Sequence, residues 1–134
     1  NPTLRKGRKS RGKSRQEPTE GHSAECLPSQ IQQEISTSLL NIFDQNPQIS
    51  EPFIEPVTDS IAPNYSSEIA VPMNLQMIVE RLSFGFYRHP KAIISDLNLI
   101  AKNCEAYNGY DLPLSKQARK IVAASISAVN NLVC

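Results

Sequence analysis

The segment NCEAYNGYDLPL, residues 103–114, places a polar amide beside aromatic side chains where a helix is expected to end. Asn108 carries a neutral side chain that can donate and accept hydrogen bonds without bringing a charge out of water. It follows Tyr107 and precedes Gly109, a residue type that commonly terminates helices. Two interpretations are open: Asn108 ends the helix as a capping or left-handed residue, or it presents its amide to a ligand.

Residues that could support catalysis or hold a metal are scattered along the chain. Cys26, Cys104 and Cys134 form no C-x-x-C pair, and His22 and His89 are the two histidines. Because a zinc site needs about four converging ligands, we expect no metal and no other cofactor. The motifs G-x-G-x-x-G, H-E-x-x-H and G-x-S-x-G do not occur, so an enzyme is not expected.

The chain of 134 residues has a formal net charge of +1 that is distributed unevenly. Residues 1–26 contain seven basic and three acidic residues, whereas the remainder contains seven basic and ten acidic residues. With few apolar side chains, residues 1–27 are predicted to be a disordered basic tail or linker. Three roles are open for the run from Arg5 to Arg15: a solvated linker, a nuclear-import signal, or an arm that makes weak contact with nucleic acid.

The isolated cysteines are typical of a reducing compartment. No stretch approaches the roughly 18 to 20 continuous apolar residues of a membrane span, and the N-terminus has no apolar signal region. We therefore expect a soluble intracellular chain with no membrane contact.

Apolar residues at spacings of three and four predict four helices. The first begins at Ser29, where Ser29 and Gln32 fit a capping box, and ends near Asn46-Pro47. The second is capped by Asn74 and ends near residues 83–85. The expected inner faces of these two helices are Ile31, Ile35, Leu39, Ile42 and Phe43, and then Leu75, Ile78 and Leu82.

The third helix is expected to follow His89-Pro90, with His89 as its cap, and the fourth to start around residues 111–113. Their inner faces are Ile93, Leu97, Ile100, Cys104 and Tyr107, and then Leu114, Ala118, Ile121, Val122, Ile126, Val129 and Val133. Between the first two helices, residues 47–72 show no period and combine five prolines with several large apolar residues. This composition predicts an all-α four-helix bundle with a long, packed and ordered loop after its first helix.

Four local motifs, in this order, resemble those of a bromodomain. EPFIEPV at residues 51–57 is similar to the family's W-P-F-x-x-P-V shelf, and PNY at residues 63–65 is similar to P-D-Y. VPMNL at residues 71–75 resembles T-P-M-D-L, which opens the family's second long helix. FYRHPKAIISDLNLIAKNCEAYN at residues 86–108 resembles its third long helix with a closing asparagine.

The resemblance covers roughly Ser29 to Leu132 and implies a left-handed antiparallel four-helix bundle, with residues 28–134 as the bromodomain. The run GFYR at residues 85–88 resembles the first bromodomain of WD-repeat-plus-bromodomain proteins. Bromodomains read acetylated lysine. The resemblance thus implies a nuclear, monomeric reader that binds peptides of acetylated histones or other acetylated proteins.

The resemblance also implies the binding residues. Asn108 is expected to donate to the acetyl carbonyl, and Tyr65 to reach the same oxygen through a water molecule. The remaining predicted contacts are Phe53, Pro56, Val57, Ile61 and Ala62 as the apolar wall, Tyr107 and Tyr110 at the rim, and Leu114 as the gatekeeper side chain.

The shelf departs from the family pattern at Glu51, which stands where the family usually has tryptophan. Losing on the order of 50 Å² of apolar contact at about 25 cal/mol per Å² costs about 1 kcal/mol of binding free energy. Ser60 and Ala62 also make the loop wall smaller, which predicts a wide pocket of low affinity. The alternative function is a degenerate bromodomain that serves as a chromatin-associated scaffold with weak or no acetyl-lysine binding.

Overall fold

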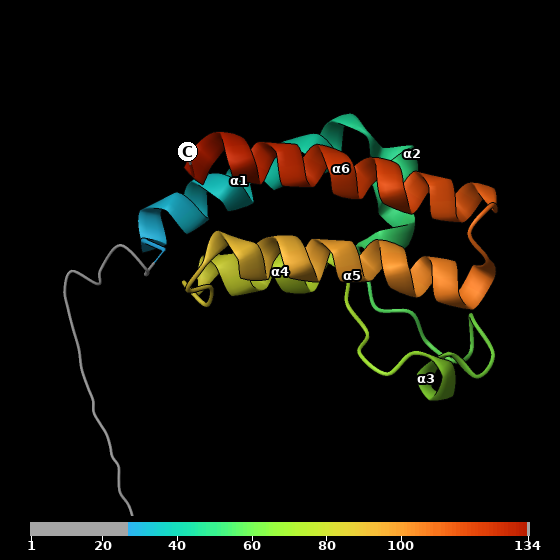
Figure 1. The fold of residues 1–134 in the computed structure, drawn as a ribbon. Coiled ribbons are helices and arrows are strands. Elements are labelled where there is room, and N and C mark those ends of the chain that lie inside the picture. Colours follow the sequence, from blue (N-terminus) through green and yellow to red (C-terminus); the bar gives the residue numbers. More distant parts are fainter. Residues whose placement is uncertain (1–26, 134) are drawn as a thin grey trace, which may run out of the picture.

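The computed structural model describes residues 27–133 (Figure 1). The basic run from Arg5 to Arg15, with its expected nucleic-acid contact, lies outside the described residues, as does nearly all of the tail predicted over residues 1–27. Leu27, the last residue of that predicted tail, is described, and its backbone N–H donates to the Arg88 carbonyl oxygen at 3.0 Å.

Four long helices form the body of the described chain: α1 (Ser29–Gln45), α4 (Leu75–Ser83), α5 (Pro90–Asn108) and α6 (Pro113–Val133). They pack as a closed ring, because α1 contacts α4, α4 contacts α5, α5 contacts α6 and α6 contacts α1. In Figure 1, α1 and α6 lie above α4 and α5. The predicted all-α four-helix bundle is confirmed, and the four helices begin and end close to the predicted positions.

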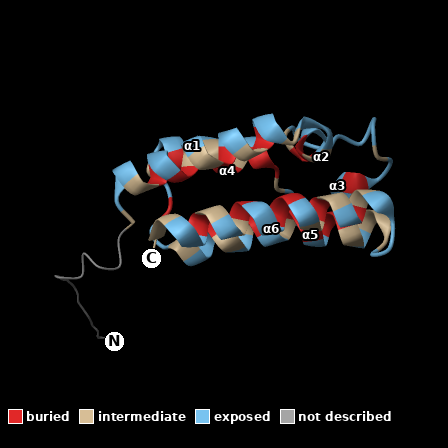
Figure 2. Cartoon of the chain, turned by 90° about the horizontal axis from the view of Figure 1, so that it is seen from above, coloured by how far each residue is buried: buried red, intermediate tan, exposed pale blue. Residues whose placement is uncertain are grey.

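The core consists of the apolar faces that these helices turn toward one another (Figure 2). Its members follow the predicted stripes, whereas the outermost stripe residues are only half-buried at the core's edge. Completely buried members are Ile35, Leu39, Leu75, Ile78, Leu82, Ile93, Leu97, Ala118 and Val129. The three- and four-residue spacing of apolar side chains therefore determines how the helices face the core.

The predicted cap of α4 is confirmed, because the Asn74 side-chain oxygen accepts from the Met77 backbone N–H at 2.8 Å. The predicted capping box at the start of α1 is wrong: the helix begins at Ser29, but no side chain caps it. Gln32 instead points into the bundle, where it is 1% exposed. His89 occupies the N-cap position of α5, and its side chain forms no capping hydrogen bond.

Gln32 satisfies backbone groups of two other segments. Its Nε2 donates to the carbonyl oxygens of Leu27 at 2.9 Å and Tyr87 at 2.8 Å, and its Oε1 accepts from the Tyr87 N–H at 3.1 Å. A buried backbone group without a partner costs about 1–3 kcal/mol, so this demand outweighs a local cap at an exposed helix end. Gln32 therefore fastens the link between α4 and α5 to the start of α1.

The same link is fixed by the Tyr87 side chain, which is 2% exposed. Its hydroxyl donates to Asp96 Oδ2 at 2.7 Å, and Arg81 donates to the same oxygen at 2.9 Å. Burial, followed by the bond to Asp96, raises the pKa of Tyr87 above its usual range, so the hydroxyl keeps its proton at physiological pH.

The crossover between α1 and α4 contains three short elements: α2 (Pro47–Ser50), the 3₁₀ turn η2 (Glu51–Phe53) and α3 (Tyr65–Glu68). They are too short to produce a recognisable apolar period, which explains why the sequence predicted only a loop there. Phe53 and Ile69 are buried, and the Asn103 side chain of α5 donates to the Val71 carbonyl oxygen at 2.9 Å. The crossover is therefore packed and ordered, as predicted.

Within the crossover, Asp59 organises the turn that leads into α3. Its two carboxylate oxygens accept from the Ser66 N–H at 2.8 Å and the Ser66 hydroxyl at 2.7 Å. These bonds, the hydroxyl first, lower the pKa of Asp59 below its ordinary value. Asn64 adopts a left-handed conformation with φ of 64° immediately before α3, a conformation that asparagine tolerates better than most residues. Both features give the segment a defined path past the end of α5.

Candidate functional site

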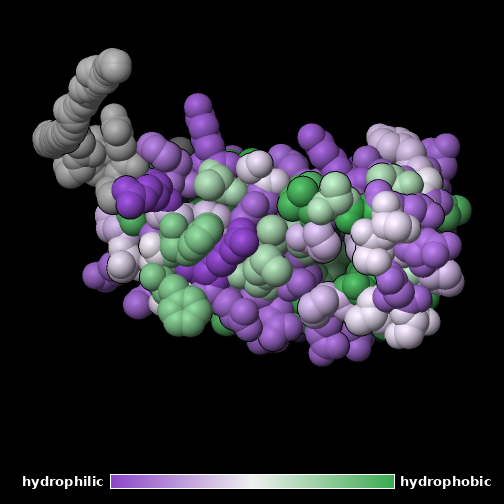
Figure 3. All heavy atoms as spheres, turned by 90° about the horizontal axis from the view of Figure 1, so that it is seen from below, coloured by the Kyte–Doolittle hydropathy of each residue, from purple (hydrophilic) through white to green (hydrophobic). Residues whose placement is uncertain are grey.

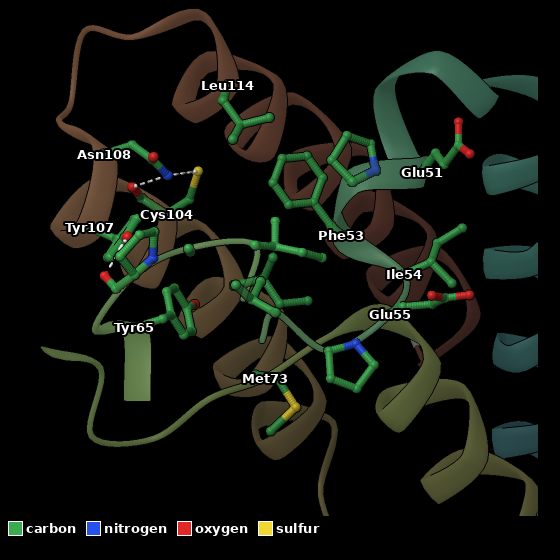
Figure 4. Close-up of a pocket in the computed structure, with 17 residues that line it drawn as sticks. Glu51, Phe53, Ile54, Glu55, Tyr65, Met73, Cys104, Tyr107, Asn108 and Leu114 are labelled. Atoms are coloured by element: carbon green, nitrogen blue, oxygen red, sulfur yellow. Dashed lines mark hydrogen bonds between the residues drawn. The ribbon is translucent and has the colours of Figure 1, made fainter. Parts of the chain in front are cut away.

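The crossover and the α5–α6 link lie at the same end of the bundle (Figure 1). A cavity of about 780 Å³ opens between them (Figure 4). Its lining comes from three regions: the crossover, the C-terminal half of α5 and the first turn of α6. The lining residues are Glu51, Pro52, Phe53, Ile54, Glu55, Pro56, Val57, Ile61, Ala62, Pro63, Tyr65, Met73, Ile100, Cys104, Tyr107, Asn108 and Leu114. Every residue predicted for the binding site except Tyr110 is among them.

Asn108 is the last residue of α5 and lies half-buried in the cavity wall. Its side-chain Nδ2 donates to the Cys104 carbonyl oxygen at 3.3 Å and approaches Cys104 Sγ at 3.5 Å. The positive φ that ends the helix belongs to Gly109, at 112°, so the left-handed alternative for Asn108 is wrong. The bond to the last helical turn orients the amide along the cavity wall rather than out into bulk solvent (Figure 4).

Tyr65 faces Asn108 across the inner part of the cavity (Figure 4). Its side chain is 8% exposed, and its hydroxyl has no hydrogen-bond partner among residues 27–133. Burial, with a smaller effect of the neighbouring Cys104, raises the pKa of Tyr65 above its ordinary value, so the neutral hydroxyl is the form present at physiological pH. A buried hydroxyl without a protein partner is costly, and it is available to a ligand or an ordered water.

Tyr107 joins the two walls of the cavity. Its ring packs edge-on against Tyr65 with centroids 5.1 Å apart, and its hydroxyl donates to the Pro63 carbonyl oxygen at 2.7 Å. The side chain was predicted as the last residue of the third helix's inner face and as a rim contact. In the structure it also holds the crossover against the end of α5.

Removing this hydroxyl should loosen the crossover without dismantling the bundle. We expect Tyr107→Phe to lower the free energy of unfolding by about 0.5–1.5 kcal/mol and to speed amide hydrogen exchange over residues 58–66. Urea denaturation and hydrogen exchange measure the two effects. Tyr110→Phe is the matched control, because the Tyr110 hydroxyl forms no hydrogen bond within the described residues; equal exchange in both variants would contradict the role of Tyr107.

Tyr110 is not among the residues that line the cavity, and its place at the rim of the binding site stays a prediction. It is 61% exposed, and the guanidinium of Arg119 lies 3.9 Å from its ring centroid. Arg119 also donates to Glu105 at 2.8 Å and to the Tyr110 carbonyl oxygen at 3.1 Å. The turn at Gly109 and these contacts from α6 hold the ring on the outside of the α5–α6 link.

The apolar wall is partly open to solvent. Phe53 is buried, but Val57 is 40% exposed and Ile61 is 78% exposed. Apolar side chains accordingly lie among hydrophilic ones at the crossover end of the face shown in Figure 3. The wide pocket of low affinity that the small loop residues predict stays a prediction.

Several lining residues were not predicted. Ile100 and Cys104 precede Asn108 by two turns and one turn of α5, so continuing the predicted stripe to the helix end identifies them as neighbours of the amide. Ile54, Met73 and Pro63 come from the aperiodic crossover, where no sequence signal indicates which side chains turn inward. Glu55 was not predicted either, and Glu51 was noted only as a lost apolar contact.

One further sequence pattern lies outside the described residues. GRKSRGKS at residues 7–14 matches the G-x-x-x-x-G-K-[ST] spacing of phosphate-binding loops. In those loops the pattern follows a buried strand and opens a helix, and the residues flanking it here contain no apolar run of either kind. We therefore assign no phosphate site to it.

Within residues 27–133, no group of three or more His, Cys, Asp or Glu side chains is arranged to hold a metal ion. None of the helices in this part of the chain is both long and apolar enough to cross a membrane.

An all-α ring of helices with a mostly apolar end cavity defines a class of small binding modules. The bromodomain family model matches residues 35–120, and the chain belongs to the bromodomain family. This match spans both walls of the cavity, from the crossover through the start of α6.

Individual proteins agree with this assignment. The crystal structure of PP-BRD20 from Tb427tmp, complexed with BI-2536, superposes with a TM-score of 0.67 and 32% sequence identity, covering 78% of this chain and 91% of that one. The chain is 43% identical over 56 residues to an ATPase family AAA domain-containing protein of Arabidopsis thaliana. It is 36% identical over 73 residues to transcription initiation factor TFIID subunit 1 of Drosophila melanogaster.

The matched regions cover 42% and 54% of this chain, but only 5% and 3% of those two relatives. The chain therefore corresponds to one module of much longer proteins.

Proposed function

We propose that this bromodomain reads acetylated lysine on histone tails or other nuclear proteins, with Asn108 as the amide anchor. The observation that carries the proposal is a pair of polar groups that line the cavity: the Asn108 amide, and the Tyr65 hydroxyl, which has no hydrogen-bond partner within residues 27–133. Around them the lining is apolar, with Ile100, Phe53 and Leu114 among its members. Such a site suits a ligand with an apolar stem and one neutral polar head.

Donor and acceptor counts explain the expected selectivity. The acetylated side chain ends in a neutral amide, whose carbonyl accepts from Asn108 directly and from Tyr65 directly or through water. An unmodified lysine brings three donors and no acceptor. The two carboxylates that line the cavity, Glu51 and Glu55, are exposed and lie on the opposite side of Phe53 from Asn108 (Figure 4). An ammonium placed at Asn108 would therefore be buried without a carboxylate beside it, which costs far more than burying an amide.

Isothermal titration calorimetry with peptides that differ only by one acetyl group tests the proposal. We expect the acetylated peptide to bind and its unmodified twin to bind at least about tenfold more weakly, since one unmatched buried polar group costs about 1.4 kcal/mol or more. Equal affinities would overturn acetyl-lysine reading. No binding of any acetylated peptide by a folded sample would favour the scaffold alternative that Glu51 suggests.

The wider setting follows from the same proposal. Bromodomains are generally non-catalytic readers, and the similarity to a subunit of a transcription initiation factor favours a chromatin-associated, nuclear role. We propose that residues 28–134 act as a monomeric module within a longer protein. The basic tail stays a candidate linker, import signal or nucleic-acid arm.

A further inference from the structure

We infer that Glu51 and Glu55 make this bromodomain selective for acetylated lysines that have a basic residue a few positions away in the peptide. The inference rests on the proposed function. Glu51 stands where the family usually has tryptophan, and a carboxylate can attract a basic peptide residue, whereas an indole ring carries no charge.

The first observation is the charge of the cavity. Glu51 and Glu55 are its only lining residues that carry a formal charge at neutral pH, and both are exposed. The whole crossover, residues 46–74, contains four carboxylates and no Lys, Arg or His. A peptide that lies along this edge therefore meets negative potential without a compensating cation from the crossover.

The second observation is that these carboxylates are not used by the fold. Within residues 27–133, neither Glu51 nor Glu55 takes part in an ion pair or a side-chain hydrogen bond. Asp59, by contrast, is engaged by Ser66, and the basic side chain of Arg119 is held by Glu105. The two shelf glutamates thus remain free to pair with a ligand.

The third observation is their position relative to the anchor. Figure 4 shows Glu51 and Glu55 beside Ile54, on the opposite side of Phe53 from Asn108. At the Asn108 end of the cavity, the Tyr65 side chain is buried and its hydroxyl has no hydrogen-bond partner within residues 27–133. This indicates that the cavity takes a ligand, and it does so independently of Glu51 and Glu55. With the acetyl group at Asn108, an extended peptide advancing about 3.3 Å per residue carries its flanking side chains across Phe53 toward the two carboxylates.

The expected gain is modest because both carboxylates face solvent. An exposed ion pair contributes about 0.2–1 kcal/mol, which corresponds to roughly 1.5- to 5-fold in affinity for each flanking cation. Screening shortens the range of this attraction to about 10 Å at 0.1 M salt, so the preference should shrink as salt is added.

The test compares acetyl-lysine peptides in which one neighbour at a time, at each of several positions, is Lys, Ala or Glu. Fluorescence anisotropy at low and high salt gives the affinities for the wild type and for Glu51→Gln, Glu55→Gln and the double variant. We expect the best Lys peptide to bind about tenfold more tightly than its Glu counterpart at low salt, and the double variant to reduce this ratio to about twofold. Glu68→Gln, an exposed glutamate on α3 outside the cavity lining, is the matched control.

The outcomes separate this inference from the function on which it rests. The preference for Lys over Glu near the acetylated lysine is called the flank preference. If it survives in the double variant, or if Glu68→Gln removes it equally well, the role of Glu51 and Glu55 is overturned. Acetyl-dependent binding with no flank preference overturns it too, while acetyl-lysine reading stands. Flank-dependent binding that is the same for unmodified peptides overturns acetyl-lysine reading, and the inference with it.

Discussion

An Asn108→Ala variant is expected to lose acetylated-peptide binding while keeping its fold. The substitution removes the donor that would meet the acetyl carbonyl and leaves that carbonyl in a site lined largely by apolar groups. An unmatched buried polar group costs about 1–3 kcal/mol, so affinity should fall roughly 10- to 100-fold, which for a weak ligand is a complete loss of signal. Calorimetry with the acetylated peptide measures this loss.

The fold should tolerate the change, because within the described residues the Asn108 side chain bonds only to Cys104, one turn earlier in the same helix. Circular dichroism and urea denaturation check this expectation. Asn98→Ala is the matched control: it removes an exposed asparagine from the same helix, outside the cavity lining. If Asn108→Ala binds within about twofold of the wild type, the amide is not the anchor.

The fold was predictable where the sequence carries a long periodic signal. The stripe from Ile93 through Cys104 spans several turns, so its spacing fixes both the presence of α5 and the face that α5 buries. The cap of α4 was predictable because Asn74 bonds to a group three residues away in its own chain segment. Local signals of this kind need no knowledge of the other helices.

A prediction failed where a distant partner determines the side-chain contacts. Gln32 was expected to form a capping box with Ser29, but its side chain bonds to Leu27 and to Tyr87, which lies 55 residues later in the chain. The end of α5 at Gly109 was predictable from the residue type, whereas the stacking of Arg119 on Tyr110 was not, because Arg119 lies on the next helix. The nine predicted residues that line the cavity were found through a family resemblance, which already contains such long-range information.

A Gln32→Ala variant is expected to be strongly destabilised. It would leave the buried Tyr87 N–H and carbonyl oxygen and the part-buried Leu27 carbonyl oxygen without their partner. It would also leave a cavity where the 1% exposed side chain had been. Unsatisfied buried groups cost about 1–3 kcal/mol each before relaxation, and the lost packing adds to this, so the free energy of unfolding should fall by about 3–5 kcal/mol. That is a large share of the roughly 5–15 kcal/mol typical of a domain.

Urea denaturation measures the loss, and two further variants separate its causes. Gln33→Ala removes an exposed neighbour from the same turn of α1 and should change stability by less than about 0.5 kcal/mol. Gln32→Met keeps most of the side-chain volume but none of the hydrogen bonds, so it should recover only the packing part. Gln32 bonds to the α4–α5 link and is not among the residues that line the cavity. Since the α4–α5 and α5–α6 links lie at opposite ends of the bundle (Figure 1), the folded fraction of each variant should bind peptide as the wild type does. If Gln32→Ala lowers the free energy of unfolding by less than about 1 kcal/mol, water replaces the amide in its hydrogen bonds. Gln32 would then not be the residue that holds the α4–α5 link in place.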